Sequence, residues 1–99
     1  MEFNELMTED RRLSLLLLLS KAPASRCNGY VLHSGLQAMG HACSAAQVET
    51  DAAWLAEQGL VATERLGDRM LVLTLTPRGD DVAHGRAIQP GVKRPSPGA

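Results

Sequence analysis

The chain has 99 residues, with 10 basic and 11 acidic side chains, a formal net charge of −1 and 3% aromatic residues. We expect a chain of this length to form one small domain with a thin core and room for short tails. The near-neutral charge argues against a dedicated nucleic-acid binder, which usually carries a clear basic excess. Seven of the acids lie in residues 1–60 and six of the bases in residues 61–99, so the first part is acidic and the second mildly basic.

We expect residues 1–7 to form an N-terminal extension that is followed by a helix. Thr8 is a suitable N-cap for this helix, because acidic residues follow it in the first turn, where the helix dipole favours them. The helix should run from about Glu9 to Lys21 and end before Pro23, because the residue before a proline disfavours helical geometry.

Residues 13–22, LSLLLLLSKA, are the most apolar segment of the chain. The segment has about half of the ~20 residues that a membrane span needs, so we expect a buried helix and no association with a membrane. Its leucines fill two neighbouring helical faces, whereas an amphipathic helix needs only one. The second face is covered either by other elements of the same chain or by a second copy, and we expect a homodimer formed through this helix and the terminal segments.

A helix–turn–helix unit is predicted next. The sequence SRCNGY indicates a turn in which Asn28 is the N-cap of a helix over about residues 29–39, and Gly40 suits the left-handed position that ends a helix. Ser44 begins a capping box, with a glutamine three residues later, and the helix that it starts should end at Gly59. The inward positions of this helix are predicted to be Val48, Ala52 and Leu55.

Beyond Gly59 the apolar period changes from helical to strand-like. LVATERL and RMLVLTL flank Gly67 and Asp68, which predicts a hairpin with a two-residue turn. Thr76 then caps a short helix with a proline at its first position. Residues 88–99 hold three of the five prolines, and this composition predicts a basic, Pro/Gly-rich tail that is flexible or ordered by a partner.

Three helices and then a hairpin form the order of a winged helix-turn-helix, an α+β fold with a three-helix core, a two-stranded antiparallel wing and a short C-terminal helix, here within residues 8–87. VETDAAWLAEQGLV, residues 48–61, resembles the recognition helix and first wing strand of ArsR/MarR-like regulators, and LTLTPRGDDVA, residues 73–83, resembles the segment that follows. The whole layout, with PGVKRP at residues 90–95, resembles a group of small proteins from Mu-like bacteriophages. The resemblance covers about residues 8–95 and implies a DNA-binding, transcription-regulator-like protein.

Candidate DNA contacts lie on the second helix of the unit, on the wing and in the tail. Glutamine can pair with adenine, a threonine hydroxyl can reach a phosphate, and basic side chains neutralise phosphates. The candidates are Gln47, Thr50, Arg65, Arg69, Lys93 and Arg94. Glu49 and Asp51 are expected on the same outward face, where they would meet phosphates with no basic residue beside them on the helix. The alternative function is therefore an adaptor that binds a phage or host protein through the same fold, without DNA.

Neither metal binding nor catalysis is predicted. The two cysteines and three histidines lack the spacing of a four-ligand zinc site, so we expect Cys43 to be a small buried hydrophobe and the histidines to lie in turns or on the surface. The chain has no phosphate-binding glycine loop and no HExxH or GxSxG motif. We therefore expect a non-enzymatic protein without a cofactor. With no signal peptide, it should reside in the reducing cytoplasm of a bacterial host, where its cysteines stay free.

Overall fold

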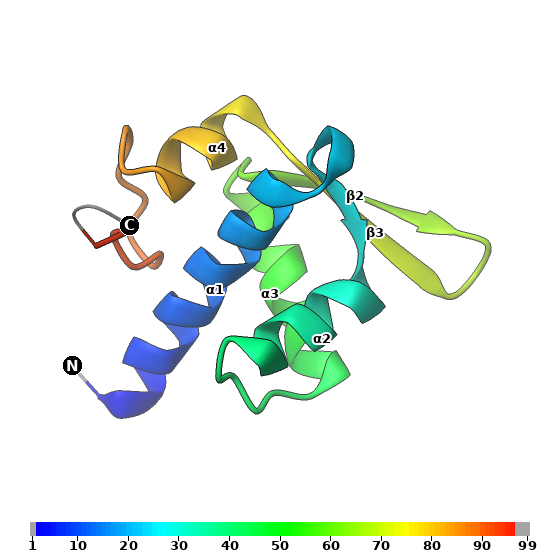
Figure 1. The fold of residues 1–99 in the computed structure, drawn as a ribbon, viewed down its shortest axis with the longest axis horizontal. Coiled ribbons are helices and arrows are strands. Elements are labelled where there is room, and N and C mark those ends of the chain that lie inside the picture. Colours follow the sequence, from blue (N-terminus) through cyan, green and yellow to red (C-terminus); the bar gives the residue numbers. More distant parts are fainter. Residues whose placement is uncertain (1, 97–99) are drawn as a thin grey trace.

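Four α-helices and a three-stranded antiparallel sheet make up residues 2–96, the part of the chain that the computed structural model describes (Figure 1). The elements in chain order are α1 (Phe3–Lys21), the 3₁₀ turn η1 (Pro23–Ser25), β1 (Arg26–Asn28), α2 (Gly29–Ala38), α3 (Ala45–Glu57), β2 (Val61–Leu66), β3 (Met70–Leu75) and α4 (Pro77–Ala83). The predicted α+β class is confirmed. None of the helices in this part of the chain is both long and apolar enough to cross a bilayer.

Helix α1 crosses the middle of the molecule, and α2, β3 and α4 all pack against it (Figure 1). Its leucines are buried on both predicted faces, and the most buried are Leu13, Leu15, Leu16 and Leu19. Other elements of the same chain therefore cover them, which confirms the first of the two alternatives for this helix. The helix begins at Phe3 and not at the predicted Glu9, and the hydroxyl of Thr8 donates to the carbonyl of Asn4 (2.9 Å) instead of capping. Once a helix has nucleated, each added residue gains a backbone hydrogen bond, so it can extend over a segment that lacks its own start signal.

The sheet has the strand order β1–β3–β2, so a third strand, β1, which was not predicted, joins the two strands of the predicted hairpin. β1 pairs with β3 from Arg26 opposite Thr74 to Asn28 opposite Val72, in the segment that was predicted to be a turn. A three-residue polar strand carries no alternation of apolar residues, so the sequence offered no strand signal there. The hairpin β2–β3 was predicted, but the pair Leu66–Met70 leaves three residues in its turn and not two.

The caps of α2 and α3 are confirmed. The side chain of Asn28 accepts a hydrogen bond from the backbone N–H of Val31 (2.9 Å). Ser44 and Gln47 form the capping box at the start of α3. Gly40 and Gly59 follow the two helices with φ angles of +90° and +75°, a region that favours glycine. The predicted inward side chains of α3 are all buried, namely Val48, Ala52 and Leu55.

Helix α4 packs closely on the start of the hairpin. Thr76 accepts a hydrogen bond from the N–H of Gly79 (3.0 Å), which confirms the predicted cap. A Cβ atom on Gly79 would lie 2.0 Å from the carbonyl oxygen of Leu60, so only glycine fits there.

The described part of the C-terminal segment lies across α1, contrary to the flexible or partner-ordered tail that was predicted. Val92 is buried, and the backbone N–H of Lys93 donates to the carbonyl of Glu9 (3.2 Å). Arg12 donates to the carbonyl of Gly91 (2.9 Å), and its guanidinium lies 3.8 Å from the ring centroid of Trp54. These contacts explain why a segment rich in proline and glycine is ordered. Residues 97–99 of the predicted tail lie outside the described residues.

Candidate nucleic-acid interface

The exposed face of α3 is built from small and polar side chains. The exposed residues of its first nine positions are Ala45, Ala46, Gln47, Glu49, Thr50 and Ala53. Helix α3 packs against both α2 and β2. Its N-terminal half shares a pocket with the start of α2, and Glu49 in this half contacts Arg65 of the hairpin. Short side chains let another surface approach the helix backbone closely, so this face can serve as a contact surface.

Asp51 does not belong to this face, which corrects its predicted outward position. Its exposed fraction is 2%, and both Nε and Nη2 of the buried Arg11 donate to its carboxylate (Nη2–Oδ1 3.2 Å). This hydrogen bonding raises the pKa of the Arg11 guanidinium and outweighs the lowering effect of burial. The helical spacing of Asp51 could have indicated its inward position. Asp51 is three residues after Val48 and four before Leu55, so it lies on the inward stripe of α3.

Glu49 is exposed, but a basic side chain of the hairpin neutralises its charge. Arg65 Nη2 lies 2.6 Å from Glu49 Oε1, and both side chains are about half exposed. A second bridge, between Arg26 and Glu64 (2.6 Å), joins β1 to β2. Arg69, by contrast, forms no salt bridge with any acid of residues 2–96. The surface around α3 therefore carries nearly balanced charge with one unpaired guanidinium.

Gln47 and Thr50 lie on the exposed face as predicted, although both side chains already make local hydrogen bonds. The amide oxygen of Gln47 accepts from the N–H of Ser44 (2.9 Å) in the capping box. The hydroxyl of Thr50 donates to the carbonyl of Ala46 (3.0 Å). A two-bond contact from Gln47 to adenine needs both its oxygen and its nitrogen, so it would have to break the capping box.

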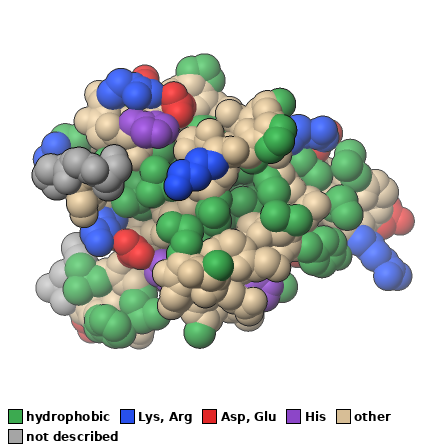
Figure 2. Space-filling view, in the orientation of Figure 1, with side chains coloured by type: hydrophobic (Ala, Val, Ile, Leu, Met, Phe, Trp, Pro, Cys, Tyr) green, Lys and Arg blue, Asp and Glu red, His purple; other side chains and the backbone are tan. Residues whose placement is uncertain are grey.

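The structure does not bring Lys93 and Arg94 together with the hairpin. Lys93 Nζ lies 3.2 Å from Asp10 of α1, and the C-terminal segment lies at the opposite end of the molecule from the β2–β3 hairpin (Figure 1). Lys93 and Arg94 therefore cannot extend the same contact surface as Arg65 and Arg69. On the face that Figure 2 shows, the basic side chains are scattered between hydrophobic ones and do not gather into one patch.

His41 lies in the turn between α2 and α3, one of the two positions predicted for the histidines, and it is buried there. Its exposed fraction is 7%, and its Nε2 lies 2.7 Å from Oδ2 of Asp10. Cys27 and Cys43 are free thiols and half-buried, and burial raises the pKa of Cys43. Within residues 2–96, no three side chains of His, Cys, Asp or Glu come together as possible metal ligands.

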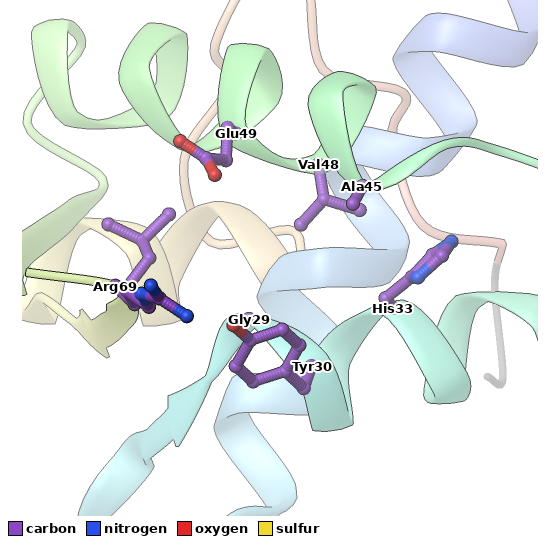
Figure 3. A pocket seen from close by; sticks show the side chains of 8 residues that line it. Gly29, Tyr30, His33, Ala45, Val48, Glu49 and Arg69 are labelled. Carbon is purple, nitrogen blue, oxygen red and sulfur yellow. The ribbon is translucent and has the colours of Figure 1, made fainter.

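A pocket opens beside the start of α3, between α2, α3 and the first residues of β3 (Figure 3). Its apolar side is formed by Val48, Leu71 and Ala45. Its remaining lining residues are Gly29, Tyr30, His33, Glu49 and Arg69. Tyr30 has an exposed fraction of 60%, and the sequence assigned it no role. We call this the α2–α3 pocket.

The fold and this surface together define a small α+β protein in which a capped helix pair is followed by a β-hairpin. The chain belongs to the family of protein gp26 of Escherichia phage Mu, with which it is 47% identical over 96 residues, covering 97% of this chain and 98% of gp26. A protein of Haemophilus influenzae is 42% identical over 78 residues, which is 79% of this chain and 76% of that protein. The predicted resemblance to Mu-like phage proteins is thereby confirmed. No family model matches the chain, so the ArsR/MarR-like assignment stays a prediction.

Among solved structures, the hsRosR-S1 complex contains a chain that is similar to this one with a TM-score of 0.61 and 21% identity. The match covers 71% of this chain and 61% of that chain, so this protein spans about three fifths of its length. At this identity the likeness concerns the fold alone.

Proposed function

We propose that this protein binds double-stranded DNA as a winged-helix, regulator-like protein, with the exposed face of α3 and the β2–β3 hairpin as its contact surface and without enzymatic activity. The main support for the proposal is that the charges of two acidic side chains of α3 are neutralised by basic partners. Asp51 is buried against Arg11, and Glu49 is paired with Arg65. These are the two acidic residues whose expected exposure argued against DNA binding, and neither would meet a phosphate as an unpaired charge.

The arrangement of the elements supports the same role. In a helix–turn–helix unit the second helix lies in the major groove, where its N-terminal residues contact base edges. Here the N-terminal half of α3 is the exposed half, and the hairpin arginines lie beside it.

The test is the affinity for a fluorescein-labelled random 20-base-pair duplex, measured by anisotropy at increasing salt. Each neutralised phosphate contributes about −0.9 to the slope of log affinity against log salt. Arg65→Gln removes a basic side chain from this surface and leaves Glu49 unpaired, so it should weaken binding and reduce the slope by at most about 0.9. Arg78→Gln makes the same charge change on the exposed surface of α4 and should leave the slope unchanged.

Glu49→Gln sharpens this test, because it removes a negative charge and frees Arg65 from its salt bridge. It should bind the same duplex more tightly than the unmodified protein, by roughly 3- to 10-fold at low salt, since like charges no longer oppose each other. No binding of the unmodified protein at about 20 mM salt, where phosphate contacts are strongest, would contradict the proposal.

The second candidate function is a protein-binding adaptor. It is favoured by exposed apolar side chains at the start of α2, beside the pocket that α2 shares with α3: Tyr30 and Val31 are 60% and 56% exposed. Exposed apolar residues that gather in a patch commonly mark protein contacts. A pull-down from infected cells with and without nuclease separates the two: a partner protein retained after nuclease supports the adaptor, and loss of all partners supports DNA.

We also propose that the protein forms a homodimer through the first turns of α1. Phe3 and Leu6 are 72% and 50% exposed there, although the leucines farther along α1 are buried within the chain. Sedimentation equilibrium should give a dimer, and Leu6→Glu should give a monomer, because a buried unpaired charge destabilises an apolar interface. A monomer at every concentration of the unmodified protein would refute this part of the proposal.

A further inference from the structure

We propose that the α2–α3 pocket binds one backbone phosphate of the DNA duplex, held between the guanidinium of Arg69 and the hydroxyl of Tyr30. The proposal rests on the proposed function. It adds Tyr30 of α2, which the sequence did not assign to the site, as a phosphate-binding residue. It also places a phosphate contact beside α3, apart from the side chains of α3 that would face the bases.

The pocket brings together side chains from three parts of the fold. Tyr30 belongs to the first turn of α2, Arg69 directly precedes β3, and Glu49 belongs to α3. In Figure 3 the guanidinium of Arg69 extends towards Tyr30, whereas His33 lies at the other end of the pocket. A phosphate at the opening can therefore contact Arg69 and Tyr30 together.

The charge state of the lining residues favours an anion. Arg69 forms no salt bridge with an acid of residues 2–96, whereas Arg65 and Arg26 are each paired with a glutamate. An anion can thus bind Arg69 without breaking an existing ion pair. Glu49 also lines the pocket, but the salt bridge to Arg65 offsets its negative charge.

The polar groups of the pocket fit a phosphate better than a neutral ligand. The Nε2 of His33 lies 2.6 Å from the carbonyl oxygen of Cys43, and because a carbonyl only accepts, this nitrogen carries the hydrogen. His33 is therefore already engaged at that nitrogen. The side-chain donors that remain are the planar fork of Arg69 and the phenolic hydroxyl of Tyr30, and phosphate oxygens accept from both. Val48 and Leu71 offer only apolar surface, on which the sugar next to the phosphate can lie.

Two substitutions separate the two contacts. Arg69→Gln removes the charge and should reduce the salt slope for the labelled 20-base-pair duplex by about 0.9, with a loss of affinity. Tyr30→Phe removes only a neutral hydroxyl, so it should weaken binding by about 3- to 10-fold at fixed salt and leave the slope unchanged. Tyr30 is 60% exposed, so this change should not affect folding, and a thermal melt of each variant checks that it does not.

Arg94→Gln is the matched control, because Arg94 is exposed and follows Lys93, which is held against α1 away from the pocket. It should match the unmodified protein in both affinity and slope. If the unmodified protein binds the duplex but Arg69→Gln keeps its slope, or Tyr30→Phe keeps its affinity, the pocket is not a phosphate site and the proposed function stands. If the unmodified protein does not bind the duplex at low salt, both proposals are overturned.

Discussion

Removing Asp51 should destabilise the protein strongly, because it leaves the guanidinium of Arg11 buried without its counter-ion. The exposed fractions of Asp51 and Arg11 are 2% and 8%, so water cannot replace the lost partner. Removing one partner of a buried ion pair lowers the free energy of unfolding by about 3–5 kcal/mol. That is a large part of the roughly 5–15 kcal/mol that stabilises a typical domain. For a chain of this size, Asp51→Ala should lower the melting temperature by roughly 15–30 °C.

The assay is urea unfolding followed by circular dichroism, in which the midpoint should fall without a change in slope. Asp68→Ala at the exposed hairpin tip is the control and should change stability by less than about 0.5 kcal/mol. Replacing both partners, as Arg11→Met with Asp51→Leu, should recover most of the loss, since an apolar pair of similar volume has no unpaired charge. A loss below about 1 kcal/mol for Asp51→Ala, or a double variant that is as unstable as the sum of the singles, would refute the reasoning.

Two further predictions concern packing and pH. Gly79→Ala should cost about 3 kcal/mol or more, because its Cβ would meet the Leu60 carbonyl oxygen at 2.0 Å. Gly29→Ala is its control and should be tolerated, since its nearest contact is 3.7 Å; equal losses in urea unfolding would contradict this. Burial raises the pKa of the Cys43 thiol. The unfolded chain then loses this proton first, so stability should fall as pH rises above about 8.5. Cys43→Ala should remove that part of the pH dependence of stability. If stability depends on pH in the same way in this variant, the prediction is wrong.

The features that the sequence predicted best are those fixed by local hydrogen bonds. Asn28, Ser44 and Thr76 all cap helices where they were expected to, because a cap needs only its own residue and the next turn. Gly40 and Gly59 end helices for an equally local reason. The start of α1, strand β1 and the packing of the C-terminal segment depend on distant partners, and the sequence did not reveal them.

The candidate site was predicted in part. Arg65 lies on the hairpin as expected, but its contact with Glu49 of α3, 16 residues away, was not predicted, because only the tertiary fold brings the two side chains together. Asp51 was predicted on the outward face of α3, although its helical spacing indicated the core. Nothing in the sequence placed Tyr30 in the site, since Tyr30 and Arg69 line the same pocket only through the tertiary fold.

The most direct test of DNA binding at α3 is an amide chemical-shift titration of the ¹⁵N-labelled protein with a 16-base-pair duplex. If α3 and the hairpin bind DNA, signals of residues 29–33, 45–50 and 65–71 should shift together, whereas those of residues 86–94 should stay in place. Signals that do not move, or that move only in α1 and the C-terminal segment, would contradict it.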